Sequence, residues 1–125
     1  MLALPFLPRR LLGRCAHRSA RPGPHPTPRP GIDASRIPAA TALDDDSGAR
    51  TAFDQVRQIP AIADGIRCHC GCADRLYSLL ACYEGEHPMA MHCQVCQGEG
   101  RLAYRLHRAG KTLDEIRAAI DDRYG

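Results

Sequence analysis

Six cysteines lie within a stretch of 29 residues, and this cluster constrains the fold more than any other feature of the chain. They form a C-x-C-x-C group, a lone cysteine and a C-x-x-C pair, namely Cys68, Cys70, Cys72, Cys82, Cys93 and Cys96. The surrounding body, residues 51–125, has no Trp and few other aromatic residues, so it can bury only a modest apolar core. A body of this size needs a metal or disulfides to stabilise it.

The apolar periodicity of the body predicts a small all-α domain. We expect helices over residues 51–58, 73–83 and 93–110, with a short turn beginning at Pro60 and a loop over residues 84–92. Thr112-Leu113-Asp114-Glu115 is a capping box, so a last helix begins there. The fold is therefore predicted as a cysteine-rich domain of three to four short helices that ends in a helical hairpin.

The N-terminal part of the chain has a different composition. Residues 1–43 carry seven Arg against one Asp, and eight of the ten Pro lie in the first 38 residues. This predicts a disordered leader and linker over residues 1–50, followed by the domain over residues 51–125. The first twelve residues resemble parts of several targeting signals but complete none of them. We expect no transmembrane segment, because no run of about 18 apolar residues exists, and no nucleic-acid binding, because no aromatic residues interleave the basic ones.

Metal binding is the chemistry that the cysteine spacing favours. Thiolates are soft ligands that suit Zn²⁺ or Cu⁺, and the C-x-C-x-C turn and the C-x-x-C helix start can each direct two sulfurs to one point. On this interpretation the cofactor is a zinc or copper ion that is stored, delivered or sensed by exchange with a partner protein, and the chain is not an enzyme. The candidate ligands are Cys68, Cys70, Cys72, Cys93 and Cys96, with Cys82, His92 and His69 as additional donors.

Two other interpretations of the same cysteines stay open. A C-x-x-C pair at a helix N-terminus has a depressed thiol pKa, so Cys93 would attack and Cys96 resolve in a thiol-disulfide oxidoreductase. Alternatively, three disulfides would hold together a structural or interaction domain, and six cysteines allow fifteen pairings among which the sequence does not choose.

The cysteine pattern and the capping box together resemble the PCYCGC-motif family, also described as CYCXC-type (seleno)proteins. The matching segments are Ile59-Pro60, Cys68-His69-Cys70-Gly71-Cys72, Cys82-Tyr83, His92-Cys93-Gln94-Val95-Cys96, and residues 110–117 and 120–125. Arg67 and His69 stand where that family usually has Pro and Tyr. Members of the family are mostly small lipoproteins and exported proteins, so the resemblance implies the cell envelope or periplasm, with a metal- or thiol-exchanging envelope protein as partner. A cytoplasmic location is the alternative.

A weaker likeness concerns the thiol-reductase subunit of cytochrome c maturation. Cys93-Gln94-Val95-Cys96-Gln97 and Arg123-Tyr124-Gly125 are similar to segments of that family. The C-x-C-x-C group is foreign to it, so this likeness supports only the redox alternative.

One basic stripe lies outside the cysteine pattern. Arg101, Arg105 and Arg108 fall on one face of the helix expected over residues 93–110. An acidic partner or anionic lipid would suit this face, and a solvated helix surface is the alternative interpretation.

Overall fold

The computed structural model of the chain describes residues 23–43, 47–71 and 75–125, and within them it contains helices and no strand. The prediction of a small all-α domain is therefore confirmed. The α-helices are α1 (Ser47–Val56), α2 (Pro60–Ala63), α3 (Gln94–Arg108) and α4 (Leu113–Tyr124). The short 3-10 helices are η2 (Ala40–Ala42), η4 (Leu79–Tyr83) and η5 (Met89–His92).

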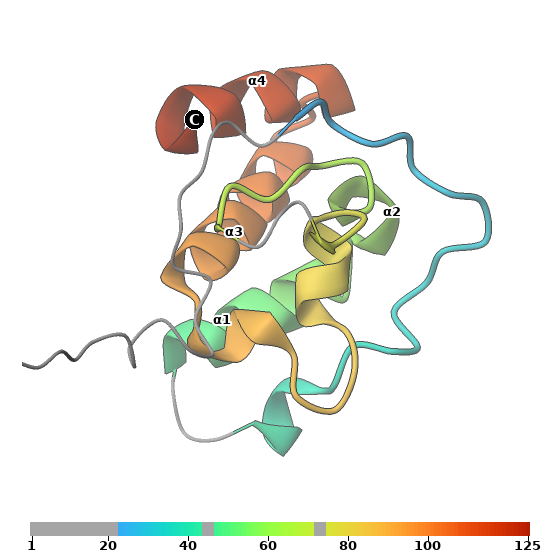
Figure 1. Cartoon of the computed structure of the whole chain (residues 1–125), viewed down its shortest axis with the longest axis vertical. Coiled ribbons are helices and arrows are strands. Elements are labelled where there is room, and N and C mark those ends of the chain that lie inside the picture. The colour runs from blue at the N-terminus through green and yellow to red at the C-terminus, as the bar shows by residue number, and fades with distance from the viewer. Residues whose placement is uncertain (1–22, 44–46, 72–74) are drawn as a thin grey trace, which may run out of the picture.

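Helix α3 is the centre of the domain, with α1 packed against one side of it and α4 folded back along it (Figure 1). Tyr124, at the end of α4, lies beside Gly98 in the N-terminal half of α3. A Cβ atom at Gly100 would lie 2.7 Å from Cγ2 of Val56, so only glycine permits the close approach of α3 to α1. Phe53 of α1 and Tyr83 of η4 meet edge to face with ring centroids 4.7 Å apart. The core therefore lies between α1, η4 and α3, and Ile116 and Ile120 of α4 complete it.

The C-terminal hairpin forms as the sequence predicts. Gly110 has φ +86° and ends α3 with a backbone conformation that other residues rarely adopt. The Thr112 hydroxyl then accepts a hydrogen bond from the Glu115 N–H, and the Glu115 carboxylate accepts one from the Thr112 N–H. Both bonds of the capping box are present, and α4 begins at the next residue.

The helix predicted over residues 73–83 is wrong in its extent. Within the described part of this range, the helical element is η4 (Leu79–Tyr83), and it is a 3-10 helix rather than an α-helix. Ser78 is fully extended, with φ −159° and ψ 175°, while its hydroxyl donates to Asp64 and the Leu79 N–H donates to the Ile66 carbonyl. These contacts to the preceding loop replace the helical bonds that the apolar periodicity predicts. The segment expected as a loop, residues 84–92, contains the single turn η5.

Residues 23–43 form an extended segment along the body, which we call the strap (Figure 1). Ile37 and Leu43 are buried in the core. Arg29 donates to the carboxylate of Asp64 from its backbone N–H, its Nε and its Nη2, at 2.7–3.1 Å. Asp64 is fully buried, so the strap supplies the charge that this carboxylate needs.

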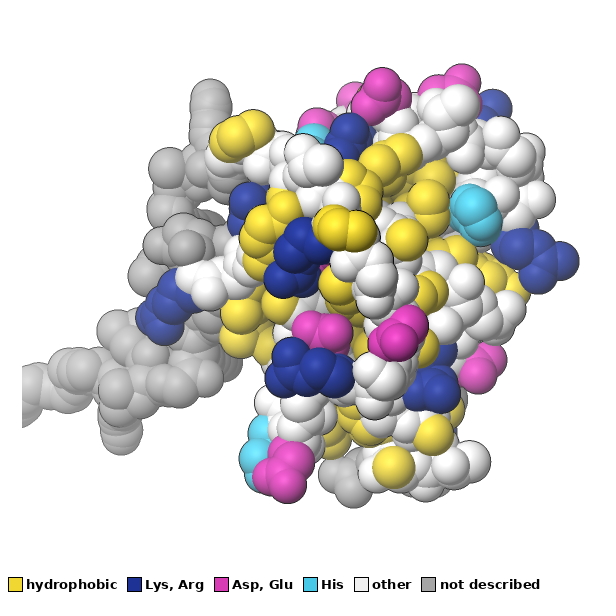
Figure 2. All heavy atoms as spheres, turned by 90° about the vertical axis from the view of Figure 1, so that its right-hand side faces the viewer, with side chains coloured by type: hydrophobic (Ala, Val, Ile, Leu, Met, Phe, Trp, Pro, Cys, Tyr) yellow, Lys and Arg dark blue, Asp and Glu magenta, His cyan; other side chains and the backbone are white. Residues whose placement is uncertain are grey.

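The expectation of disorder over residues 1–50 is therefore wrong for residues 23–43 and for residues 47–50, which begin α1. For residues 1–22 and 44–46 it lies outside the described residues. A proline-rich segment makes no regular backbone ladder, but side chains of the body bond its backbone instead. Arg117 donates to the Pro26 carbonyl, and Arg57 donates to the Ile37 carbonyl. On the face that carries the strap, hydrophobic side chains alternate with charged side chains of both signs (Figure 2).

No helix within the described parts of the chain is long and apolar enough to span a bilayer.

Candidate metal centre

Four buried cysteines converge on one point between the core elements. Cys68 and Cys70 lie on the loop after α2, Cys82 in η4 and Cys96 in the first turn of α3. Their four Sγ atoms all lie within 4.8 Å of one another, and those of Cys68 and Cys96 are 3.5 Å apart. We call these four residues the cysteine cluster.

The local backbone explains why these thiols face inward. Residues 67–69 are neither helical nor turned, and side chains of an extended chain alternate between two sides. Cys68 and Cys70 therefore point to the same side, while His69 between them points away. The bond from the Leu79 N–H to the Ile66 carbonyl, 2.8 Å long, holds this loop against the start of η4, which carries Cys82.

The spacing of the sulfurs suits one ion. With metal–sulfur bonds of about 2.3 Å, tetrahedral coordination puts neighbouring sulfurs about 3.8 Å apart. The longest separation in the cluster, 4.8 Å, exceeds this by an amount that small side-chain rotations can close. The cluster therefore has the donor atoms and the dimensions of a four-thiolate site.

Three of the four cysteines in the cluster have a raised pKa and are neutral thiols at pH 7. A hydrogen bond with Cys68 and burial raise the pKa of Cys70 to about 12. The bond with Cys70 acts to lower the pKa of Cys68, but the bond with Cys82 and burial outweigh it and raise that pKa to about 12 as well. The pKa of Cys96 is raised by its bonds with Cys68 and Cys70. A metal cation would have to displace these protons to bind thiolates.

Cys93 is a fifth sulfur at the edge of the cluster. It is the N-cap of α3, it is only half-buried, and its Sγ accepts a hydrogen bond of 3.3 Å from the Cys96 N–H. Hydrogen bonds from the thiols of Cys70 and Cys96 lower the pKa of Cys93 to about 3. Cys93 is thus a thiolate at neutral pH, and it is more exposed than the four cysteines of the cluster.

His69 does not face the cluster. Its Nδ1 lies 2.6 Å from Oε2 of Glu99, and its Nε2 lies 3.1 Å from Oδ1 of Asp121. Glu99 is fully buried and also accepts the His69 backbone N–H at 3.1 Å. The bond with Glu99 raises the pKa of His69. With both ring nitrogens engaged by carboxylates, His69 positions the loop that carries Cys68 and Cys70.

The remaining candidate ligands lie elsewhere. His92 is exposed at the end of η5 and is outside the cluster. Cys72 lies outside the described residues, so its predicted role stays a prediction. The five described cysteines of the motif are all free thiols.

Glu99 is the important residue that sequence reasoning missed. It follows Cys96 by three residues on α3, so the two share a helix face, and it lies between Gly98 and Gly100. A charged residue between two glycines on the inward face of a cysteine-bearing helix was the available signal.

No protein-family model, no curated protein and no solved structure matches this chain. The resemblances noted in the sequence therefore stay predictions, and the function is argued from the chemistry of the site.

Proposed function

We propose that this protein binds one soft metal ion, Zn²⁺ or Cu⁺, through the thiolates of Cys68, Cys70, Cys82 and Cys96. The observation that carries the proposal is the convergence of four buried sulfurs within 4.8 Å. Four thiolates saturate a tetrahedral ion and leave no position for a substrate, which argues for metal storage, delivery or sensing rather than metal catalysis.

Cys93 gives the bound ion a route to solvent. It lies beside Cys96 and Cys70 but is only half-buried, so its thiolate can replace one cluster ligand without unfolding the site. An ion held in this way passes to a partner by stepwise exchange of thiolates. The partner would be a metal-exchanging protein of the cell envelope, as the family resemblance implies.

The first test is metal stoichiometry. The full chain is purified without air and its bound Zn and Cu are measured together with its free thiols. We expect one ion per chain, lost in Cys82→Ser, and retained in the control Cys15→Ser, which removes a leader cysteine instead. Loading the metal-free protein with Zn²⁺ should also release protons at pH 7, because the pKa values of Cys68 and Cys70 lie near 12. Retention of the ion by Cys82→Ser would refute the proposed ligand set.

One observation favours a second candidate, a thiol-disulfide oxidoreductase. Cys93 combines a pKa lowered to about 3 with access to solvent, and Cys96 lies buried behind it. In this reaction the Cys93 thiolate attacks a substrate disulfide, and Cys96 then displaces the bound substrate thiol. The products are a Cys93–Cys96 disulfide and a reduced substrate dithiol, so two electrons pass to the substrate.

Alkylation separates the two candidates. A redox protein that binds no metal should be alkylated first at Cys93, with a rate that does not change when a chelator is added. A metal protein should bind the ion stoichiometrically, and its rate of alkylation at Cys93 should change on chelation, because the thiols of Cys70 and Cys96 donate hydrogen bonds to Cys93 only when they are not bound to the ion.

A further inference from the structure

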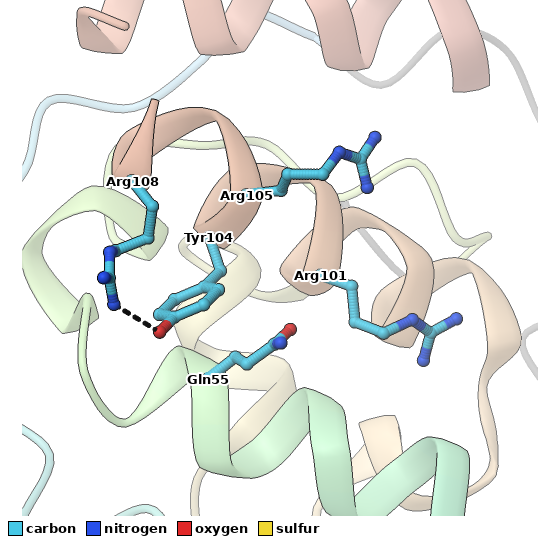
Figure 3. Close-up of a pocket in the computed structure, with 5 residues that line it drawn as sticks. All are labelled: Gln55, Arg101, Tyr104, Arg105 and Arg108. Carbon is cyan, nitrogen blue, oxygen red and sulfur yellow. Dashed lines mark hydrogen bonds between the residues drawn. The ribbon is translucent and has the colours of Figure 1, made fainter. Parts of the chain in front are cut away.

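A groove between α1 and the C-terminal half of α3 lies outside the cysteine cluster. It has a volume of about 490 Å³, within the range of small-molecule sites. Figure 3 shows its lining, in which one residue comes from α1 and four come from α3: Gln55, Arg101, Tyr104, Arg105 and Arg108. Three of the five carry a positive charge and none is acidic.

No carboxylate among the described residues neutralises the three arginines. None of them forms an ion pair with any residue that the structure describes. Arg101 donates to the Gly48 carbonyl at 3.1 Å, and Arg108 donates to the Tyr104 hydroxyl at 2.9 Å. A guanidinium has five N–H donors, so most donors in the groove stay available to a ligand.

The dipole of α3 does not explain the positions of all three arginines. Cations near a helix C-terminus interact favourably with its dipole, and this accounts for Arg105 and Arg108 in the last turn of α3. Arg101 lies about two turns earlier on the same face and gains little from the dipole. The stripe therefore extends along the groove rather than ending at the helix terminus.

Gln55 supplies the second polar feature of the groove. Its Oε1 is buried and has no hydrogen-bond partner among the described residues, where it is the single such side-chain atom. A buried acceptor without a donor is costly, so a donor from a ligand would stabilise this position. Figure 3 shows the Gln55 amide pointing from α1 toward the arginine-bearing face of α3.

We propose that this groove binds a small phosphate monoester that also carries hydroxyl groups, such as a sugar phosphate or a nucleotide. Guanidinium groups bind phosphate oxygens with two parallel hydrogen bonds, and Arg101 and Arg105 lie one helical turn apart. A ligand hydroxyl donates to Oε1 of Gln55. The site is separate from the cysteine cluster and does not depend on the proposed metal.

The test is a titration of the full chain followed by the NMR signals of the arginine Nε–H and glutamine amide groups. The probes are ribose 5-phosphate, adenosine 5′-monophosphate, inorganic phosphate and ribose. Both phosphate monoesters should give saturable shifts and bind more tightly than phosphate or ribose alone. Tighter binding of the nucleotide identifies a nucleotide site, and equal binding of the two esters identifies a sugar-phosphate site.

Two variants and a control assign the binding to the groove. Arg105→Gln should weaken both esters about tenfold, the loss of one charge-assisted contact. Gln55→Leu should weaken the esters but not inorganic phosphate, because it removes only the acceptor for the hydroxyl. The control Arg123→Gln alters an exposed arginine on α4 and should leave binding unchanged.

Three outcomes would overturn the proposal. The first is the absence of saturable shifts with either ester at millimolar concentration. The second is equal weakening by Arg105→Gln and Arg123→Gln, which would indicate attraction by overall charge. The third is binding of poly-glutamate but not of the esters, which would make the arginine face a docking surface for an acidic protein.

Discussion

The cysteine cluster and the contact of the strap with Asp64 both join segments that are far apart in the sequence. They differ in whether the chain itself supplies partners for the buried polar groups. At the strap, the buried carboxylate of Asp64 receives hydrogen bonds from Arg29 and Ser78, so the chain itself provides every partner. In the cluster, the thiols hydrogen-bond to one another, and raised pKa values keep Cys68, Cys70 and Cys96 protonated. An ion pair completed within the chain indicates a structural role, whereas the four convergent thiols are a set of donors that could hold a soft metal ion.

The largest expected effect is at the cluster. Adding Zn²⁺ to the metal-free protein at a free concentration 100-fold above Kd should raise the free energy of unfolding by about 2.7 kcal/mol. Thermal unfolding followed by circular dichroism measures this, and a chelator should reverse it. Cys82→Ser should not respond. If Zn²⁺ did not change the unfolding free energy of the wild-type protein either, the cluster would not be a metal site and would not differ from the strap in this respect.

The next effect is at the strap. Arg29→Ala should lower the free energy of unfolding by about 2 kcal/mol, because it leaves a fully buried carboxylate with Ser78 as its remaining side-chain donor. Urea unfolding at pH 7 measures the loss. The control Arg36→Ala removes an exposed arginine 3.8 Å from Glu84 and should change stability by less than about 0.5 kcal/mol. Equal effects would show that the strap is attached mainly by its apolar residues.

A pH titration tests the same attachment without removing the arginine. Burial opposes ionisation of Asp64, but the hydrogen bonds from Arg29 outweigh it and lower the pKa of Asp64 below its usual 3.8. This carboxylate therefore contributes stability that is present above pH 3.8 and is lost as the pH falls through the folded-state pKa. Asp64→Asn should flatten this part of the curve of unfolding free energy against pH. If the unfolding free energy of Asp64→Asn fell at low pH as steeply as that of the wild-type protein, groups other than Asp64 would be responsible for the loss of stability in acid.

The smallest effect is expected at the outer end of the strap. His25 lies 2.8 Å from Oδ1 of Asp121, whose side chain is half exposed. His25→Ala should therefore cost less than about 1 kcal/mol in urea unfolding. Hydrogen exchange should show faster opening of the strap near residue 25 but not near Ile37. Loss of protection along the whole strap would mean that it opens as one unit.

The sequence predicts the regular helices better than the segments between them. The capping box at Thr112 and the turn at Gly110 specify their backbone locally, and both form as predicted. The apolar pattern of the helix expected over residues 73–83 comprises Leu76, Leu79, Leu80 and Tyr83. The last three are buried and Leu76 is half-buried, but a 3-10 helix achieves this because Ser78 bonds to Asp64. That bond joins residues 14 positions apart, and periodicity carries no information about it.

The sequence predicts that the candidate site is built from thiols, but it does not predict which of the candidate residues face one another. The cysteine spacing indicates a thiolate site, and four of the predicted residues do converge. Which side each donor faces depends on the path of the loop, and this path puts His69 against Glu99 and Asp121 instead of the cluster. The strap escaped prediction for a related reason, since its partners Asp64 and Arg117 lie in distant parts of the chain.

The strap also determines where the folding unit begins. A recombinant form shortened to residues 51–125, the range that composition alone marks as the domain, would lack Arg29 and would open to water the core positions of Ile37 and Leu43. Fusion junctions and engineered protease sites intended to leave the domain intact therefore belong ahead of Gly23.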